Sequence, residues 1–91
     1  VKVRTLREHA MIGRELLLKK VSATPSTRPD IMTMCQICGA KVVDITPSTV
    51  TMEIANTPEI ITSFEEMMRP YGIMETARTG MIALQKGANK I

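Results

Sequence analysis

The sequence is short, at 91 residues, and its 44% hydrophobic and 23% charged residues are typical of a single globular domain rather than of a disordered or membrane-embedded chain. The net charge of +3 is uneven, because residues 1–28 carry seven basic and two acidic side chains (+5) and residues 29–91 carry five basic and seven acidic ones (−2). One Tyr, one Phe and no Trp leave few rings for base stacking, so a nucleic-acid-binding domain is kept only as an alternative and we expect no nucleic-acid partner.

Residues 1–13 open with a short strand-like VKV and then show no clean period, which is typical of the end of a preceding domain followed by a linker. They contain no apolar core of a secretory signal, and no apolar run in the chain approaches the roughly 20 residues of a membrane helix. We therefore expect no membrane association and a cytoplasmic location, or a plastid in a photosynthetic eukaryote. The first element of the domain is a predicted strand over about 15–23, which the proline-containing TPSTRP ends.

A helix is predicted from about Pro29 to Cys38, in the stretch that holds both cysteines in a C-x-x-C arrangement. Proline suits the first helical position, and Gly39 suits the left-handed residue that ends a helix. Apolar residues recur at i, i+3, i+4 and i+7 on one face of this helix, namely Ile31, Met34, Cys35 and Cys38. Both cysteines are therefore expected to face a core.

The spacing of the two cysteines is also that of zinc sites and dithiol redox centres. On a helix their Cβ atoms would be about 5–6 Å apart, close enough to share a ligand. A structural zinc site needs about four ligands, however, and the single histidine, His9, lies in the predicted linker. We interpret Cys35 and Cys38 as small apolar core residues, predict no metal and no cofactor, and keep a Cys-pair metal or redox module as an alternative.

A hairpin is predicted over about 41–55, because AKVVDI and VTMEIA are strand-like and the TPST between them is typical of a turn. A second helix follows, with Thr57 as its cap, Pro58 at its first position and a wide apolar stripe along one face. After the proline and glycine of RPYG, a closing strand is predicted from about 73 to 84.

The element order β-α-β-β-α-β predicts an α+β, ferredoxin-like two-layer sandwich, in which a four-stranded antiparallel sheet carries both helices on one face. The closing strand has apolar residues on both of its faces, although helices can cover only one. An apolar sheet face without a helix indicates a partner, so we expect a homodimer through the open sheet face. The candidate contact residues, taken from one face of the closing strand by strict alternation, are Met74, Thr76, Arg78 and Ile82.

Three segments of the sequence carry a resemblance to a known family. RELLLKKV, AKVVDITPSTVTMEI and RPYGIMETARTGMIALQKG occur with the order and spacing of the C-terminal domain of the small regulatory subunit of acetohydroxyacid synthase, also called acetolactate synthase. The resemblance extends from about residue 14 to residue 87. The sequence departs from the family pattern at Lys19, where an apolar residue is common, and at residues 37–40, where a Phe and an Arg are usual.

The resemblance implies three segments: 1–13 as the end of an ACT domain and a linker, 14–87 as the ferredoxin-like regulatory domain, and 88–91 as a tail. It implies a regulatory subunit that associates with a large, thiamine-diphosphate-dependent catalytic subunit, raises its activity and makes it sensitive to branched-chain amino acids, usually valine. The effector site would lie in the ACT domain, so no effector-binding residue is expected here. No catalytic residue is expected either, and the sequence itself shows no phosphate-binding glycine loop or paired nucleophile and base.

Overall fold

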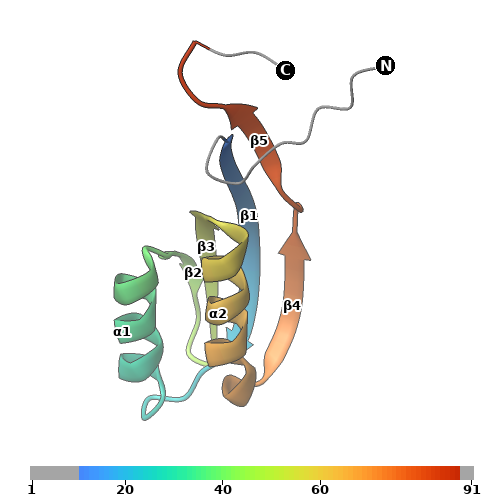
Figure 1. The fold of residues 1–91 in the computed structure, drawn as a ribbon. Helices are drawn as coiled ribbons and strands as arrows, with labels where there is room; N and C mark the ends of the chain where they lie inside the picture. Colours follow the sequence, from blue (N-terminus) through green and yellow to red (C-terminus); the bar gives the residue numbers. More distant parts are fainter. Residues whose placement is uncertain (1–10, 89–91) are drawn as a thin grey trace.

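The computed structural model describes residues 11–88 and arranges their strands and helices in two layers (Figure 1). In chain order the elements are β1 (Met11–Ser22), α1 (Arg28–Cys38), β2 (Lys41–Ile45), β3 (Thr49–Asn56), α2 (Pro58–Met68), the short 3-10 helix η2 (Arg69–Tyr71), β4 (Ile73–Arg78) and β5 (Ile82–Gln85). The strands pair antiparallel in the order β2-β3-β1-β4, and β5 pairs with the beginning of β1. Both helices pack on one face of the sheet. The predicted ferredoxin-like α+β sandwich is confirmed.

The central strand β1 is longer than the strand expected over 15–23. It begins at Met11, because its first four residues pair with β5. Residues 11–13, which the sequence analysis placed in a linker, therefore extend the central strand of the sheet. Residues 1–10 and 89–91, which make up most of the predicted linker and tail, lie outside the described residues.

The prediction of one continuous closing strand is wrong, because a bulge divides it into β4 and β5. Arg78, the last residue of β4, pairs with Leu17. Ile82, the first residue of β5, pairs with Arg14, so that two residues of β1 lie opposite three residues of the other strand. Gly80 within this bulge has a φ of +81°, a left-handed conformation that glycine adopts without strain. One extra residue reverses the alternation of side chains beyond it.

The hydrophobic core lies between the helices and the sheet. Its buried members are Leu17, Val21, Ala23, Ile31, Cys35, Val50, Met52, Ile54, Ile61, Phe64 and Met68. The β1 residues in this core have odd numbers, and their partners on β3 are core residues as well. The odd-numbered side chains of β1 therefore face the helices, and the even-numbered ones face the open side of the sheet.

The two predicted helices are confirmed to within about one residue. α1 ends where Gly39 takes a φ of +75°, and the backbone N–H of Ala40 donates to the carbonyl of Cys35 at 2.8 Å, as in a Schellman helix end. α2 begins at Pro58, directly after the predicted cap Thr57. No helix within residues 11–88 has the length and apolar character that crossing a membrane requires.

Candidate interaction surface

The sheet face turned away from the helices carries an apolar patch at its centre. Leu16 and Leu18 on β1 are 37% and 41% exposed. Ala55 on β3 pairs with Leu16, and Ala77 on β4 pairs with Leu18, and paired residues in an antiparallel sheet share a face. We call these four residues the central patch. It combines two large and two small apolar side chains.

A polar row crosses the sheet at one end of the central patch. Asp44, Thr51, Lys20 and Glu75 pair in succession across β2, β3, β1 and β4. Lys20 Nζ lies 2.7 Å from Glu75 Oε2. The hydrogen bond and the charge of Glu75 raise the pKa of Lys20, and Lys20 lowers the pKa of Glu75 in return. Lys20 and Glu75 thus stay ionised at neutral pH, and their charges limit the apolar surface on this side.

At the other end of the patch, the first residues of β1 and β5 form a two-stranded ribbon that extends past the helices (Figure 1). Ile12 pairs with Leu84, and Arg14 pairs with Ile82. Because Ile12 and Arg14 are even-numbered residues of β1, all four side chains lie on the open face. Ile12, Ile82 and Leu84 are 48%, 72% and 76% exposed. The ribbon therefore continues the central patch with strongly exposed apolar side chains.

The four predicted contact residues do not share one face of the sheet. Thr76 pairs with Lys19 and Arg78 pairs with Leu17, and both partners face the helices. Thr76 and Arg78 therefore lie on the covered face, whereas Ile82 lies on the open face. The strict alternation used in the sequence analysis fails because the bulge between β4 and β5 adds one residue.

Met74, the fourth predicted contact residue, lies at a second irregularity of β4. Lys20 pairs with Glu75, but the next residue of β1 pairs with Ile73, so Met74 is the extra residue between two successive pairs. Its side chain is 53% exposed. A contact with another subunit through any of these four residues remains a prediction.

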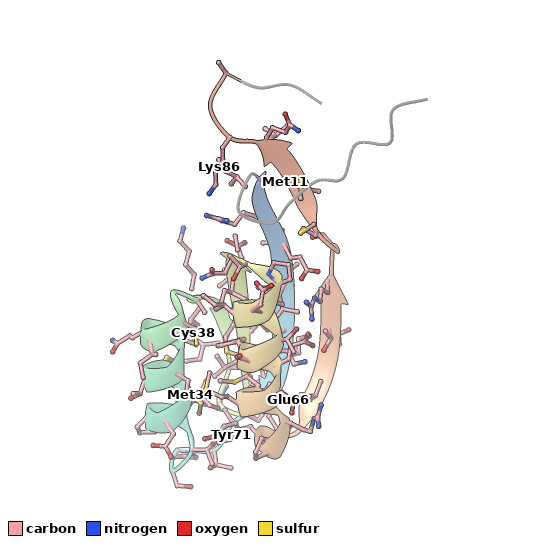
Figure 2. All side chains as sticks on the ribbon, in the orientation of Figure 1. Met11, Met34, Cys38, Glu66, Tyr71 and Lys86 are labelled. Carbon is pink, nitrogen blue, oxygen red and sulfur yellow. The ribbon has the colours of Figure 1, made fainter. Side chains whose placement is uncertain are left out.

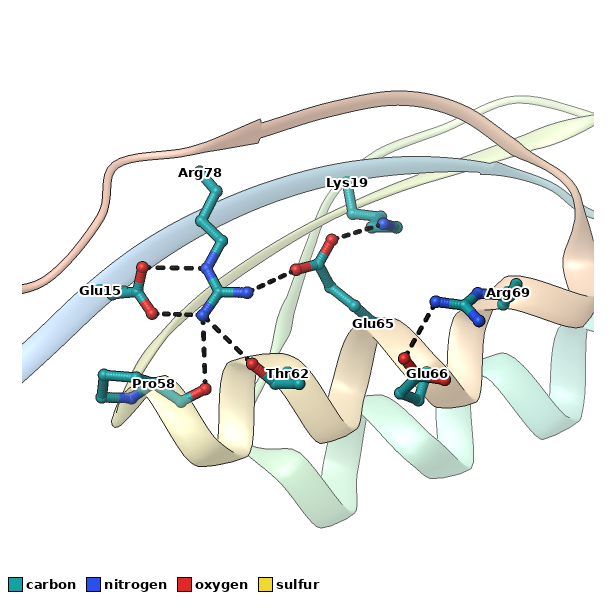
Figure 3. Close-up of polar contacts among 8 residues, drawn as sticks. All are labelled: Glu15, Lys19, Pro58, Thr62, Glu65, Glu66, Arg69 and Arg78. Atoms are coloured by element: carbon teal, nitrogen blue, oxygen red, sulfur yellow. Dashed lines mark hydrogen bonds and ion pairs between the residues drawn. The ribbon is translucent and has the colours of Figure 1, made fainter.

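Arg78 instead lies at the centre of a charged network between the sheet and α2 (Figure 3). Its Nε and Nη2 donate to the two carboxylate oxygens of Glu15, the Nε bond being 2.9 Å long, and its Nη1 donates to Glu65 Oε1 at 2.8 Å. Lys19 Nζ donates to the other oxygen of Glu65 at 2.9 Å. Glu15 and Lys19 are 5% and 3% exposed. This network fixes α2 to β1 and β4.

The network shifts the pKa values of its carboxyl groups downward. The hydrogen bonds from Arg78 lower the pKa of Glu15 more than burial raises it. For Glu65, burial is the largest single influence and raises the pKa, but hydrogen bonds and charges from Lys19 and Arg78 together bring it below the ordinary value. The pKa of Arg78 rises, chiefly because it donates to Glu15. All of these shifts favour the charged forms, as a structural ion-pair network requires.

In the sequence, Lys19 stands out as a departure from a family pattern, but nothing local in the sequence reveals this network. Its members come from distant parts of the chain, because Lys19 and Glu65 are 46 positions apart in the sequence and Glu15 and Arg78 are 63 positions apart. The available signal was the position of Lys19 on an inward-facing register of β1, because a buried lysine needs an acidic partner.

The two cysteines pack against the core, as predicted. Cys35 is buried, and Cys38 is partly buried on the same face of α1, where Figure 2 shows it with Met34 on the side facing α2. Burial raises the pKa of both thiols, and the proximity of Cys38 raises that of Cys35 further. Both are therefore protonated at neutral pH, unlike thiols that bind metals or react. Within residues 11–88, no three His, Cys, Asp or Glu side chains are grouped as metal ligands would be.

Comparison with known proteins gives a consistent result. A family model described as the small subunit of acetolactate synthase matches residues 14–87. The chain is 38% identical over 89 residues to the probable acetolactate synthase small subunit of Methanothermobacter thermautotrophicus, with 97% of this chain and 53% of that protein aligned. It is 33% identical over 90 residues to the acetolactate synthase small subunit of Bacillus subtilis, with 99% and 52% aligned.

A plant protein and a solved structure extend the comparison. The chain is 36% identical over 86 residues to acetolactate synthase small subunit 1, chloroplastic, of Nicotiana plumbaginifolia, covering 94% of this chain and 19% of that protein. The crystal structure of an acetolactate synthase small subunit from Thermotoga maritima has the same fold, with a TM-score of 0.83 at 22% identity over 90% of this chain and 50% of the other. The chain thus spans about half of the archaeal and bacterial relatives and a fifth of the plant one.

Proposed function

Because the chain belongs to the family of acetolactate synthase small subunits, we propose that it is a non-catalytic regulatory domain of that enzyme. It associates with the thiamine-diphosphate-dependent catalytic subunit, raises its activity, and forms a homodimer through the open sheet face. The observation that carries the proposal is the family match over residues 14–87, on a domain whose open face carries exposed apolar side chains.

The open face supports a role in association on energetic grounds. Burying a fully exposed Leu or Ile side chain is worth about 1.5–3 kcal/mol. The central patch and the ribbon offer five such side chains that are 37–76% exposed, and each can gain a corresponding part of this energy: Ile12, Leu16, Leu18, Ile82 and Leu84. This gain is offset by the entropy that two molecules lose when they associate. Five side chains on one continuous face are nevertheless enough to make a partner surface the simplest explanation of their exposure.

We also propose that residues 1–10 are the end of an ACT domain with its linker, that residues 11–87 are the regulatory domain, whose central strand includes Met11, and that residues 88–91 are a tail. Feedback inhibition by branched-chain amino acids, valine in particular, then depends on an effector site in the ACT domain. The archaeal and bacterial relatives, about half of whose length this chain matches, are long enough to hold such a second domain. The location is the cytoplasm, or the plastid in a photosynthetic eukaryote, and two plant relatives are named chloroplastic.

Reconstitution tests this proposal. The purified chain is titrated into the acetolactate synthase catalytic subunit of the same organism, and acetolactate formation from pyruvate is measured together with binding by a pull-down assay. We expect a saturable increase in rate that does not respond to valine, because the proposed effector site lies in another domain. Absence of both binding and activation at saturating concentrations would refute the proposal, and valine binding to the chain itself would refute the placement of the effector site.

A further inference from the structure

We propose that a second copy of this chain covers the central patch and the ribbon together, with its β1 strand antiparallel to the first. The two-fold axis lies between the two facing sheets, perpendicular to the β1 strands, at the level of Glu15. The inference rests on the proposed homodimer through the open face and adds its register. In this arrangement Ile12 of one copy lies over Leu18 of the other, and Arg14 lies over Leu16.

Side-chain size supports this register. Leu84, which is 76% exposed, is paired with Ile12, whereas the small Ala77 is paired with Leu18. When the pair Ile12–Leu84 of one copy lies over the pair Leu18–Ala77 of the other, Leu84 meets the small Ala77 while Ile12 meets Leu18, and the two-fold axis repeats both contacts. Large-on-small packing is how two facing layers reach the density of a protein interior.

Two alternative arrangements bring charges into less favourable positions. With the axis at Leu17 instead, Arg14 and Ile82 of one copy would lie over the ion pair of Lys20 and Glu75 in the other, and the exposed apolar groups would desolvate charges. With the two β1 strands parallel, Arg14 would lie over Arg14 and Lys20 over Lys20, so like charges would meet. The register at Glu15 leaves the Lys20–Glu75 pair at the rim, where interfaces are usually polar.

Charge complementarity adds a second argument. The Arg14 guanidinium donates to the neighbouring carbonyl of Gly13 at 2.7 Å, and no ion pair of residues 11–88 includes Arg14 or Glu53. Glu53 pairs with Leu18 across β1 and β3 on the open face. In the proposed register, Arg14 of the other copy lies over Leu16, and the two sheets are about 10 Å apart. Glu53 is displaced from that point by one strand, about 4.8 Å, and by two residues along the strand, about 7 Å. The two long side chains can span this separation, and the symmetry makes two such pairs.

Sedimentation equilibrium of the full 91-residue chain tests the surface. We expect a dimer whose Kd rises more than about tenfold in Leu84→Asp, because the aspartate would be buried against Ala77. Ile37→Asp is the matched control, since Ile37 is also 76% exposed but lies on α1 in the helix layer, and its Kd should stay within about twofold of the wild type. Circular dichroism and thermal unfolding of each variant confirm that it folds.

A charge exchange tests the register. Arg14→Glu and Glu53→Arg should each raise the dimer Kd about tenfold, because each places like charges together at two symmetric positions, and the double variant should return to within about threefold of wild type. A double variant as weak as the singles would overturn the register while leaving the homodimer in place. A wild-type chain that stays monomeric at millimolar concentration would overturn the homodimer too, whereas activation of the catalytic subunit is measured independently of both results.

Discussion

Lys19 occupies an inward position of β1. Among the residues that the structure describes, it has one acidic partner, Glu65, whereas Glu65 has two cationic partners. Lys19 is 3% exposed, and Glu65 keeps 23% of its side chain exposed and also accepts a hydrogen bond from Arg78. The two ends of this ion pair are therefore not equivalent. Removing Glu65 leaves a buried ammonium group without its acceptor, but removing Lys19 leaves Glu65 paired with Arg78.

We therefore predict that Glu65→Ala lowers the free energy of unfolding by about 1–3 kcal/mol, towards the lower end because Glu65 still contacts water. Lys19→Met should change it by no more than about 1 kcal/mol in either direction, since an apolar side chain of similar length fits the core-facing position. Urea unfolding measures both values.

Glu66→Ala on the same helix provides the control for this pair of variants. Within residues 11–88, Glu66 pairs only with the exposed Arg69, at 2.9 Å (Figure 3), and pairs of this kind contribute about 0–1 kcal/mol. Equal effects of Glu65→Ala and Lys19→Met would contradict the asymmetry, and an effect of Glu66→Ala as large as that of Glu65→Ala would remove any special role of the network.

Some side-chain positions could be predicted from the sequence, and others could not. The placement of Cys35 and Cys38 against the core could be predicted, because a helical period fixes which residues of one element share a face. The charged network could not, because its partners come from strands and a helix that only the tertiary fold brings together.

The bulge between β4 and β5 replaces a regular pairing of the sheet with a side-chain hydrogen bond. The backbone N–H of Leu16 donates to Thr79 Oγ1 at 3.0 Å, and the N–H of Thr79 donates to the carbonyl of Leu16 at 3.0 Å. Thr79 Oγ1 also donates to the carbonyl of Gly80 at 2.8 Å. The threonine hydroxyl thus satisfies a donor of β1 that the interrupted strand leaves without a backbone acceptor.

Two variants probe this bulge. Gly80→Ala should lower the free energy of unfolding by about 1–2 kcal/mol, because a Cβ at a φ of +81° is strained even though nothing lies within 4 Å of it. Thr79→Val should accelerate hydrogen exchange of the Leu16 amide, measured by NMR, because that amide loses its acceptor. Unchanged exchange at Leu16 would mean that another group, such as water, serves as the acceptor.

Among the elements, both helices and the hairpin were predictable because caps, turn residues and periods are local signals. The division of the last strand into β4 and β5 could not be predicted. Both faces of this strand carry apolar residues, so the sequence pattern looks the same with or without an added residue. The glycine within ARTG was the one sign of irregularity, and a glycine in a strand often marks a bulge.

Across the whole molecule, acidic side chains form ion pairs with basic side chains on both faces of the sheet. Glu15 and Glu65 are paired on the covered face, and Glu75 is paired with Lys20 on the open face. The pKa values of all three carboxyl groups are lowered in the folded chain from the ordinary value of 4.5. Their ion pairs therefore stabilise the fold as long as these groups remain ionised.

Stability should consequently fall in acid. Below pH 4.5 the unfolded chain binds protons at these carboxyl groups before the folded chain does, so the free energy of unfolding decreases as the pH falls through the lowered pKa values. Urea unfolding at several pH values from 7 down to 2.5 measures the decrease. Glu65→Ala should show a shallower dependence than wild type, and a wild-type curve that stays flat below pH 4.5 would contradict the proposed pairing.

The single added residue of the bulge determines how an insertion or deletion at this point would affect the ribbon. Loss of one codon between Arg78 and Ile82 would change no other residue of the protein, yet it would turn the side chains of Ile82 and Leu84 toward the opposite side of the ribbon. Insertion of one further codon between Arg78 and Ile82 would have the same effect. Residues at these two positions are thus comparable between family members only where the count of residues after the arginine is kept, and mutation by insertion or deletion can exchange the two sides of the ribbon in one step.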